Sequence, residues 1–148
     1  MNFSDLKLIL VPTDFSESSE AALGVAVQFA KAFHAAIEVF HVDVDPSIVL
    51  PPPLDTITLP RLFERVVAET STRLEAIVAE VRKAGVTCTS AEEFGRSHAA
   101  IVERARVVNA GLIVMGNHGK PALLAGVAEK VVQHAPCAVL VVPVAPPA

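Results

Sequence analysis

Hydrophobic residues along the chain fall into short continuous runs that alternate with longer segments of helical spacing. Four such runs cover residues 6–11, 36–42, 111–116 and 137–144. Continuous apolar runs of this length predict strands that are covered on both faces. A fifth segment, 86–94, is more polar and predicts a strand at the edge of the sheet.

Four helices are predicted between these strands from the spacing of apolar residues. The first spans 17–34 with Ser16 as its N-cap, and the second carries its apolar stripe from 62 to 81. The third follows Ser97 as N-cap, and the fourth covers about 123–134. This alternation of strand and helix predicts a parallel sheet with right-handed crossovers and helices on both faces.

One segment, 44–60, follows neither pattern. Its five prolines, three of them consecutive, exclude a helix interior and a central strand. A connection this long inside a compact domain is usually functional or mobile. The rest of the pattern contains no internal repeat, so residues 1–148 are expected to form a single domain with a proline-rich loop at 44–60.

Composition and charge limit which partners the protein is expected to bind and in which cellular compartment it is expected. The net charge of −4 makes nucleic acid an unexpected partner, because surfaces that bind phosphate backbones are usually basic. The start of the chain lacks a signal peptide's basic residues and long apolar segment, and 131–148 contains four prolines. A cytoplasmic protein with no membrane partner is therefore expected. Cys88 and Cys137 show no metal-ligand spacing and are expected to be buried thiols.

Three segments follow predicted strands and should meet at one edge of the sheet: 12–14 (PTD), 41–43 (HVD) and 116–119 (GNHG). Ligands of doubly wound sheets bind beyond the carboxyl ends of the strands, and glycines there let the backbone approach an anion. Ordinary turns use the same residue types, so both interpretations stay open. Pro121 follows Gly119 and Lys120 where a P-loop needs Ser or Thr, and no dinucleotide fingerprint follows the first strand.

Catalytic and metal-binding chemistry has little support in the sequence. Asp14, Ser16 and His41 could form a hydrolytic triad, but Ser16 is more simply an N-cap and nothing marks an oxyanion hole. The five histidines have no metal-ligand spacing and are predicted to be structural or surface residues. No metal site is predicted.

Four longer segments together resemble the universal stress protein family. They are ILVPTDFSESSEAAL at 9–23, VFHV at 39–42, FGRSHAAIVERARVVNAGLIVMGNHG at 94–119 and VAEKVVQHAPCAVLVV at 127–142. The resemblance implies an open five-stranded parallel sheet of order 3-2-1-4-5, Rossmann-like, that commonly dimerises. This strand order would place the two cysteines on opposite edges, too far apart for a disulfide.

The resemblance also implies a site for an adenine nucleotide, although only part of the family binds ATP. The motif of the binding branch is G-x2-G-x9-G followed by Ser or Thr, and Gly116 and Gly119 match its first two glycines. With Gly126 as the third glycine, the spacer is three residues short and Val127 replaces the hydroxyl. The adenosine contacts are thus expected to be kept and the triphosphate contacts weakened. The residues assigned to the site are Pro12, Thr13, Asp14, Val42, Met115, Gly116, Gly119, Gly126 and Val127.

The leading interpretation is a stress-response binding or regulatory module without a dedicated catalytic apparatus, which binds ATP, ADP or AMP. Two alternatives remain: a slow ATPase or ATP-binding switch, and a dimeric protein that binds a protein partner but no nucleotide. The apolar strand Ala138–Val142 is predicted to lie at a sheet edge and to pair with its copy in a homodimer.

Overall fold

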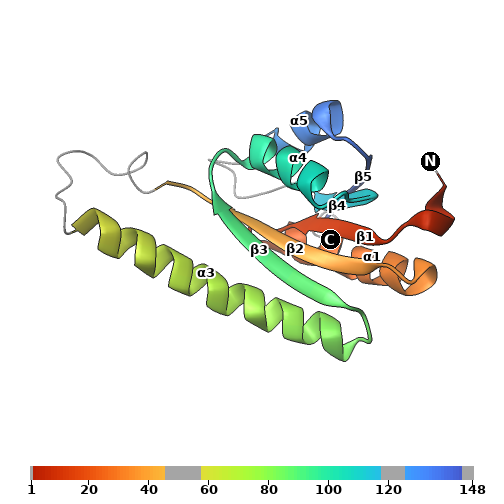
Figure 1. Cartoon of the computed structure of the whole chain (residues 1–148), viewed down its shortest axis with the longest axis horizontal. Helices are drawn as coiled ribbons and strands as arrows, with labels where there is room; N and C mark the ends of the chain where they lie inside the picture. The colour runs from red at the N-terminus through yellow and green to blue at the C-terminus, as the bar shows by residue number, and fades with distance from the viewer. Residues whose placement is uncertain (1, 46–57, 118–125, 145–148) are drawn as a thin grey trace.

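Five parallel strands form one sheet in the order β3-β2-β1-β4-β5 (Figure 1). The computed structural model describes residues 2–45, 58–117 and 126–144. Its strands are β1 (Leu8–Pro12), β2 (Ala36–Asp43), β3 (Cys88–Phe94), β4 (Leu112–Gly116) and β5 (Ala138–Val142). The predicted fold class and strand order are confirmed, and the strand bounds lie close to the predicted ones.

Helices cover both faces of the sheet, as Figure 1 shows. A short 3-10 helix, η1 (Phe3–Asp5), precedes β1. One face is covered by α1 (Glu17–Phe33) and α3 (Thr58–Lys83), and the other by α4 (Ser97–Val107) and α5 (Val127–His134). Within the described ranges, no helix is long and apolar enough to cross a membrane.

Alternation along the central strands supplies a separate core to each face. In β1, Ile9 and Val11 belong to the core under α1 and α3, whereas Leu10 belongs to the core under α4 and α5. All three side chains are fully buried, and burying each contributes about 1.5–3 kcal/mol. This explains why β1, at the centre of the sheet, has no polar side chain.

Helix α1 forms as its sequence predicts. Ser16 has extended backbone, and its Oγ accepts a hydrogen bond from the Ser19 amide at 3.3 Å. The buried face is made of Ala22, Ala26 and Ala30, whose small side chains let the helix lie close to the sheet. The helix ends at His34, which takes the left-handed conformation that closes many helices.

Three sequence predictions are wrong at helix starts. The loop predicted to reach Pro60 ends earlier, because α3 begins at Thr58 and a proline is tolerated in a first turn. Arg96, not Ser97, is the N-cap of α4, because Arg96 has the extended backbone and its carbonyl accepts from Ala100 N. Helix α5 begins only at Val127, because Gly126 takes a left-handed conformation with φ of 79°. Residues 123–125 lie outside the described ranges.

Both cysteines are unpaired thiols on opposite edges of the sheet, as the strand order predicts. Cys88 is buried in β3, and burial raises its pKa to about 11. Cys137 precedes β5 and is only partly buried, so the prediction of a buried thiol is correct for Cys88 alone. Burial raises the pKa of Cys137 as well. Both thiols are therefore protonated and unreactive at neutral pH.

Candidate functional site

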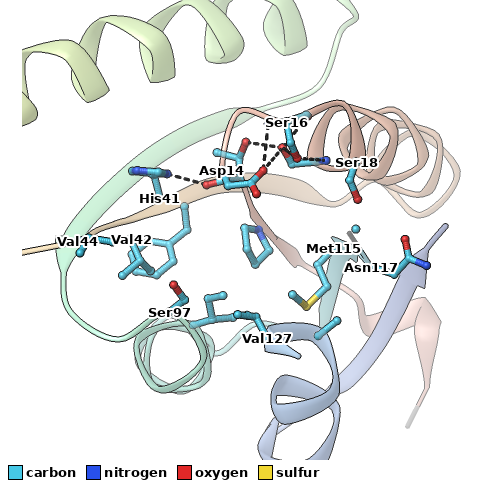
Figure 2. Close-up of a pocket in the computed structure, with 17 residues that line it drawn as sticks. Asp14, Ser16, Ser18, His41, Val42, Val44, Ser97, Met115, Asn117 and Val127 are labelled. Atoms are coloured by element: carbon cyan, nitrogen blue, oxygen red, sulfur yellow. Dashed lines mark hydrogen bonds between the residues drawn. The ribbon is translucent and has the colours of Figure 1, made fainter. Parts of the chain in front are cut away.

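A pocket of about 250 Å³ lies at the carboxyl ends of β1, β2 and β4 (Figure 2). Most residues of the predicted site line it: Pro12, Thr13, Asp14, Val42, Met115, Gly116 and Val127. Gly126 precedes Val127 but is not among the lining residues. Gly119 lies outside the described ranges. The three strand ends thus meet at one edge, as parallel pairing requires.

One side of the pocket is apolar. Val42 and Val44 extend from the end of β2, and Val127 lies at the start of α5 (Figure 2). Met115 on β4 faces the same cavity and is 5% exposed. This apolar slot suits the apolar part of a ligand, because ligand sites combine apolar walls with a few placed polar groups.

The polar side is the turn between β1 and α1. Asp14 Oδ1 accepts hydrogen bonds from Ser16 N at 3.0 Å and from Ser19 Oγ at 3.1 Å. Thr13 Oγ1 accepts from Phe15 N at 3.1 Å, which holds Phe15 at a φ of 65°. A bulky residue rarely adopts this conformation without local support. These contacts fix the orientation of the Asp14 carboxylate at the pocket.

The amino ends of α1, α4 and α5 all reach the pocket. They contribute Ser18 from α1, Ser97 from α4 and Ala128 from α5. Helix amino ends carry partial positive charge and unpaired N–H groups, which favour an anion. No lysine or arginine occurs among the described residues that line the pocket. These helix ends contribute positive potential at the described part of the pocket.

Gly116 lies where β4 meets the start of α1. A Cβ atom at this position would collide with Ser18 Oγ and lie 2.8 Å from the Ser18 carbonyl carbon and oxygen. The glycine therefore allows α1 to approach the strand, whereas the sequence predicts the close approach of a ligand at this position. The position of Ser18 at the pocket depends on this contact.

His41 lines the pocket beside Thr13, and its contacts differ from those of the hydrolytic triad that the sequence already disfavoured. Its Nδ1 is 2.7 Å from the Thr13 carbonyl oxygen, and its Nε2 is 3.3 Å from Asp43 Oδ1. Both ring nitrogens are thus engaged away from Asp14 and Ser16. Among the described residues, no group of three His, Cys, Asp or Glu side chains is placed to hold a metal ion.

Several lining residues were not predicted as site residues from the sequence: Ser18, Val44 and Ser97. Each follows the carboxyl end of a strand, and this position is the one sequence signal that could have identified them. Ser97 was predicted as a helix cap and instead lines the pocket from the first position of α4.

Comparison with known proteins identifies the family. The model of the universal stress protein family matches residues 6–143. The chain belongs to the universal stress protein family. Universal stress protein MJ0531 of Methanocaldococcus jannaschii is 35% identical over 141 residues, which cover 92% of this chain and 81% of that protein.

Two solved structures are similar along nearly the whole chain. Protein MJ0577, whose biochemical function was assigned from its structure, is similar with a TM-score of 0.82 and 28% sequence identity. The matched region covers 95% of this chain and 98% of the MJ0577 chain. A universal stress protein in complex with cAMP is similar with a TM-score of 0.69 and 25% sequence identity. The matched region covers 93% of this chain and 96% of that protein's chain.

Proposed function

We propose that this universal stress protein binds an adenine nucleotide of low charge in the pocket and acts as a binding or regulatory module in a stress response. The observation that carries the proposal is the pocket itself, where an apolar slot adjoins three helix amino ends. The relative solved in complex with cAMP supports the ligand class. The regulatory role rests on family membership.

The adenosine part of the ligand fits the described walls. The adenine ring would lie in the apolar slot, with the backbone of Val42 at its edge and Met115 beneath it. The Asp14 carboxylate, held by Ser16 and Ser19, would accept hydrogen bonds from ribose hydroxyls. Because His41 is engaged with Thr13 and Asp43, we propose binding rather than hydrolysis.

The part of the pocket that would hold the phosphate favours a ligand with few negative charges. A triphosphate carries several negative charges, which proteins usually meet with lysine, arginine or a metal ion. The described pocket offers backbone amides and serine hydroxyls instead. Loss of one hydrogen bond to a charged group costs about 1.5–3 kcal/mol. We therefore propose AMP or a cyclic monophosphate as a better ligand than ATP or ADP.

A charge placed at Val127 tests the proposed site. Val127→Glu puts a carboxylate at the amino end of α5, where it favours the helix but repels a phosphate. We expect AMP to bind about tenfold more weakly to Val127→Glu than to the uncharged Val127→Gln, a difference of about 1.4 kcal/mol, and adenosine to bind equally to the two variants. The measurement is a thermal-shift titration with both ligands, and ligand at about a hundred times its Kd should add ~2.7 kcal/mol to wild-type stability.

Val127→Gln is the matched control, because it has the same size as Val127→Glu without the charge. Both variants lose the apolar Val127 side chain, so the charge alone separates their affinities for AMP. Equal AMP affinity in the two variants would contradict a phosphate at the amino end of α5. Wild-type protein that is stabilised by none of these ligands would favour the alternative of a partner-binding protein without nucleotide.

We also propose a homodimer formed through β5. This strand lies at the sheet edge, and all five of its apolar residues are partly exposed. Antiparallel pairing with a second copy would satisfy the open backbone groups of the edge. Light scattering at micromolar concentration should give the mass of two chains, and the mass of one chain would contradict the proposal. A further protein partner would then use another surface.

We propose a cytoplasmic location because of the state of the two cysteines. Cys88 and Cys137 are both unpaired. Free thiols are typical of proteins in a reducing compartment.

A further inference from the structure

A second cavity, of about 350 Å³, lies on the face of the sheet that α1 and α3 cover. Its floor is formed by Val11 of β1 and Val39 of β2, and its walls by Leu23 of α1 and Ile77 of α3. Sites for small molecules usually have volumes of about 300–1,000 Å³ and mostly apolar walls with a few polar groups. This cavity, the α1–α3 groove, meets both conditions.

The α1–α3 groove is distinct from the pocket at the strand ends. Among the described residues, Thr13 and Ser19 are the only ones that line both. Thr13 Oγ1 donates to Ser19 Oγ at 3.1 Å, so these hydroxyls bind each other within the turn that separates the two sites. A ligand of the groove therefore depends on other residues, and its binding does not require a nucleotide.

Phe15 gives the groove a fixed aromatic surface next to this turn. Its φ of 65° is rare for a bulky residue, and the Thr13 hydroxyl holds it there by accepting from the Phe15 amide at 3.1 Å. The ring centroid lies 4.6 Å from that of the His41 ring and 5.1 Å from the guanidinium carbon of Arg73. Strained backbone that is held by its surroundings often occurs where a protein clamps a ligand.

Two side chains of opposite charge line the same groove, Arg73 from α3 and Glu20 from α1. Both residues are exposed, and within the described part of the chain neither forms an ion pair with the other or with a third residue. The contact of Arg73 with the Phe15 ring engages its charge rather than an acceptor, so its N–H groups can still donate to a carboxylate. The Glu20 carboxylate can accept from an ammonium group.

We propose that the α1–α3 groove binds a free α-amino acid with a large apolar side chain, such as leucine. The apolar side chain would lie on the floor of the groove, against Leu23 and Ile77. The ligand's carboxylate would accept from Arg73, and its ammonium would donate to Glu20. A simple carboxylic acid is repelled by Glu20 and a simple amine by Arg73, so the zwitterion is the ligand whose charges match both residues.

Calorimetric titration of the full chain with three related compounds tests which groups the groove recognises. L-Leucine, 4-methylpentanoate and 3-methylbutylamine carry the same branched apolar group but differ in which charges they carry. Leucine should bind with a Kd of about 1 mM or tighter, and at least about tenfold more tightly than either of the other two. No binding of leucine, or equal binding of 4-methylpentanoate, would overturn the proposal.

Single variants test the two charged contacts. Arg73→Gln should weaken leucine binding at least about tenfold, whereas Arg65→Gln, on the exposed side of the same helix, should leave it unchanged. Glu20→Gln should remove the preference for leucine over 4-methylpentanoate. Glu17→Gln is its control, because Glu17 is also an exposed acidic residue in the first turn of α1 but does not line the groove. Equal effects of a variant and its control would contradict the assigned contact.

Methyl resonances in NMR show where leucine binds. Added leucine should shift the methyl signals of Val11 and Val39, which form the floor of the groove, and leave the Met115 methyl signal in place. Shifts at Met115 and Val127 without shifts at Val11 would put leucine in the pocket at the strand ends and overturn the proposal. These measurements use protein without nucleotide, so they hold whether or not the proposed binding of an adenine nucleotide is correct.

Discussion

Replacement of Arg104 by alanine is expected to lower the free energy of unfolding by about 3–5 kcal/mol, because it leaves a buried carboxylate without its partner. Glu38 of β2 is 6% exposed, and Arg104 Nε donates to its Oε1 at 2.6 Å. The Arg104 guanidinium also lies 5.9 Å from the centroid of the Phe40 ring, which lines the pocket. This pair therefore fixes α4 to the strand that carries one wall of the site.

Urea unfolding of two variants measures this effect. The double variant Glu38→Leu with Arg104→Met should recover most of the loss, because a buried ion pair replaced by apolar groups of similar size is often neutral or stabilising. A loss below about 1 kcal/mol in Arg104→Ala would show that water solvates Glu38 and that the pair is in effect a surface pair.

Gly116→Ala is expected to cost about 1–3 kcal/mol by overpacking and to abolish nucleotide binding. The new Cβ would lie 2.8 Å from the backbone carbonyl of Ser18. Backbone at a helix start cannot yield as a flexible side chain can, so the amino end of α1 must move away from β4. The movement would displace Ser18 and the neighbouring Asp14 turn from the pocket.

Gly24→Ala is the matched control on the same helix. No atom lies within 4 Å of a Cβ built at Gly24, and the residue is exposed within α1. Alanine there should stabilise the protein by about 0.5–1 kcal/mol, since it favours the helix. Thermal unfolding and AMP titration of both variants give the comparison. Unchanged AMP affinity in Gly116→Ala would mean that the contact between α1 and β4 does not shape the site.

Much of the fold could be predicted because its signals are local. The apolar runs around Ile9 and Ile113 indicate central strands, and the stripe through Leu74 and Val81 indicates the buried face of α3. Helix starts were harder to predict, because a cap depends on backbone conformation rather than residue type. Ser97 is a good capping residue by type, yet Arg96 has the extended backbone that a cap requires.

The site residues likewise fall into two groups, those that strand order places and those that depend on how the elements pack. Residues next to strand ends, such as Thr13, Val42 and Met115, could be placed at one edge from the strand order. The position of Glu92 opposite His41 could not, because it depends on the register between β2 and β3. The collision that keeps residue 116 a glycine likewise depends on how closely α1 packs against β4.

Titration calorimetry with AMP, cAMP and ATP tests the central claim most directly. The described pocket combines an apolar slot with three helix amino ends and no basic side chain. We predict that AMP or cAMP binds at least about tenfold more tightly than ATP, which corresponds to the loss of about one hydrogen bond to a charged group. Tighter binding of ATP than of AMP would contradict the account.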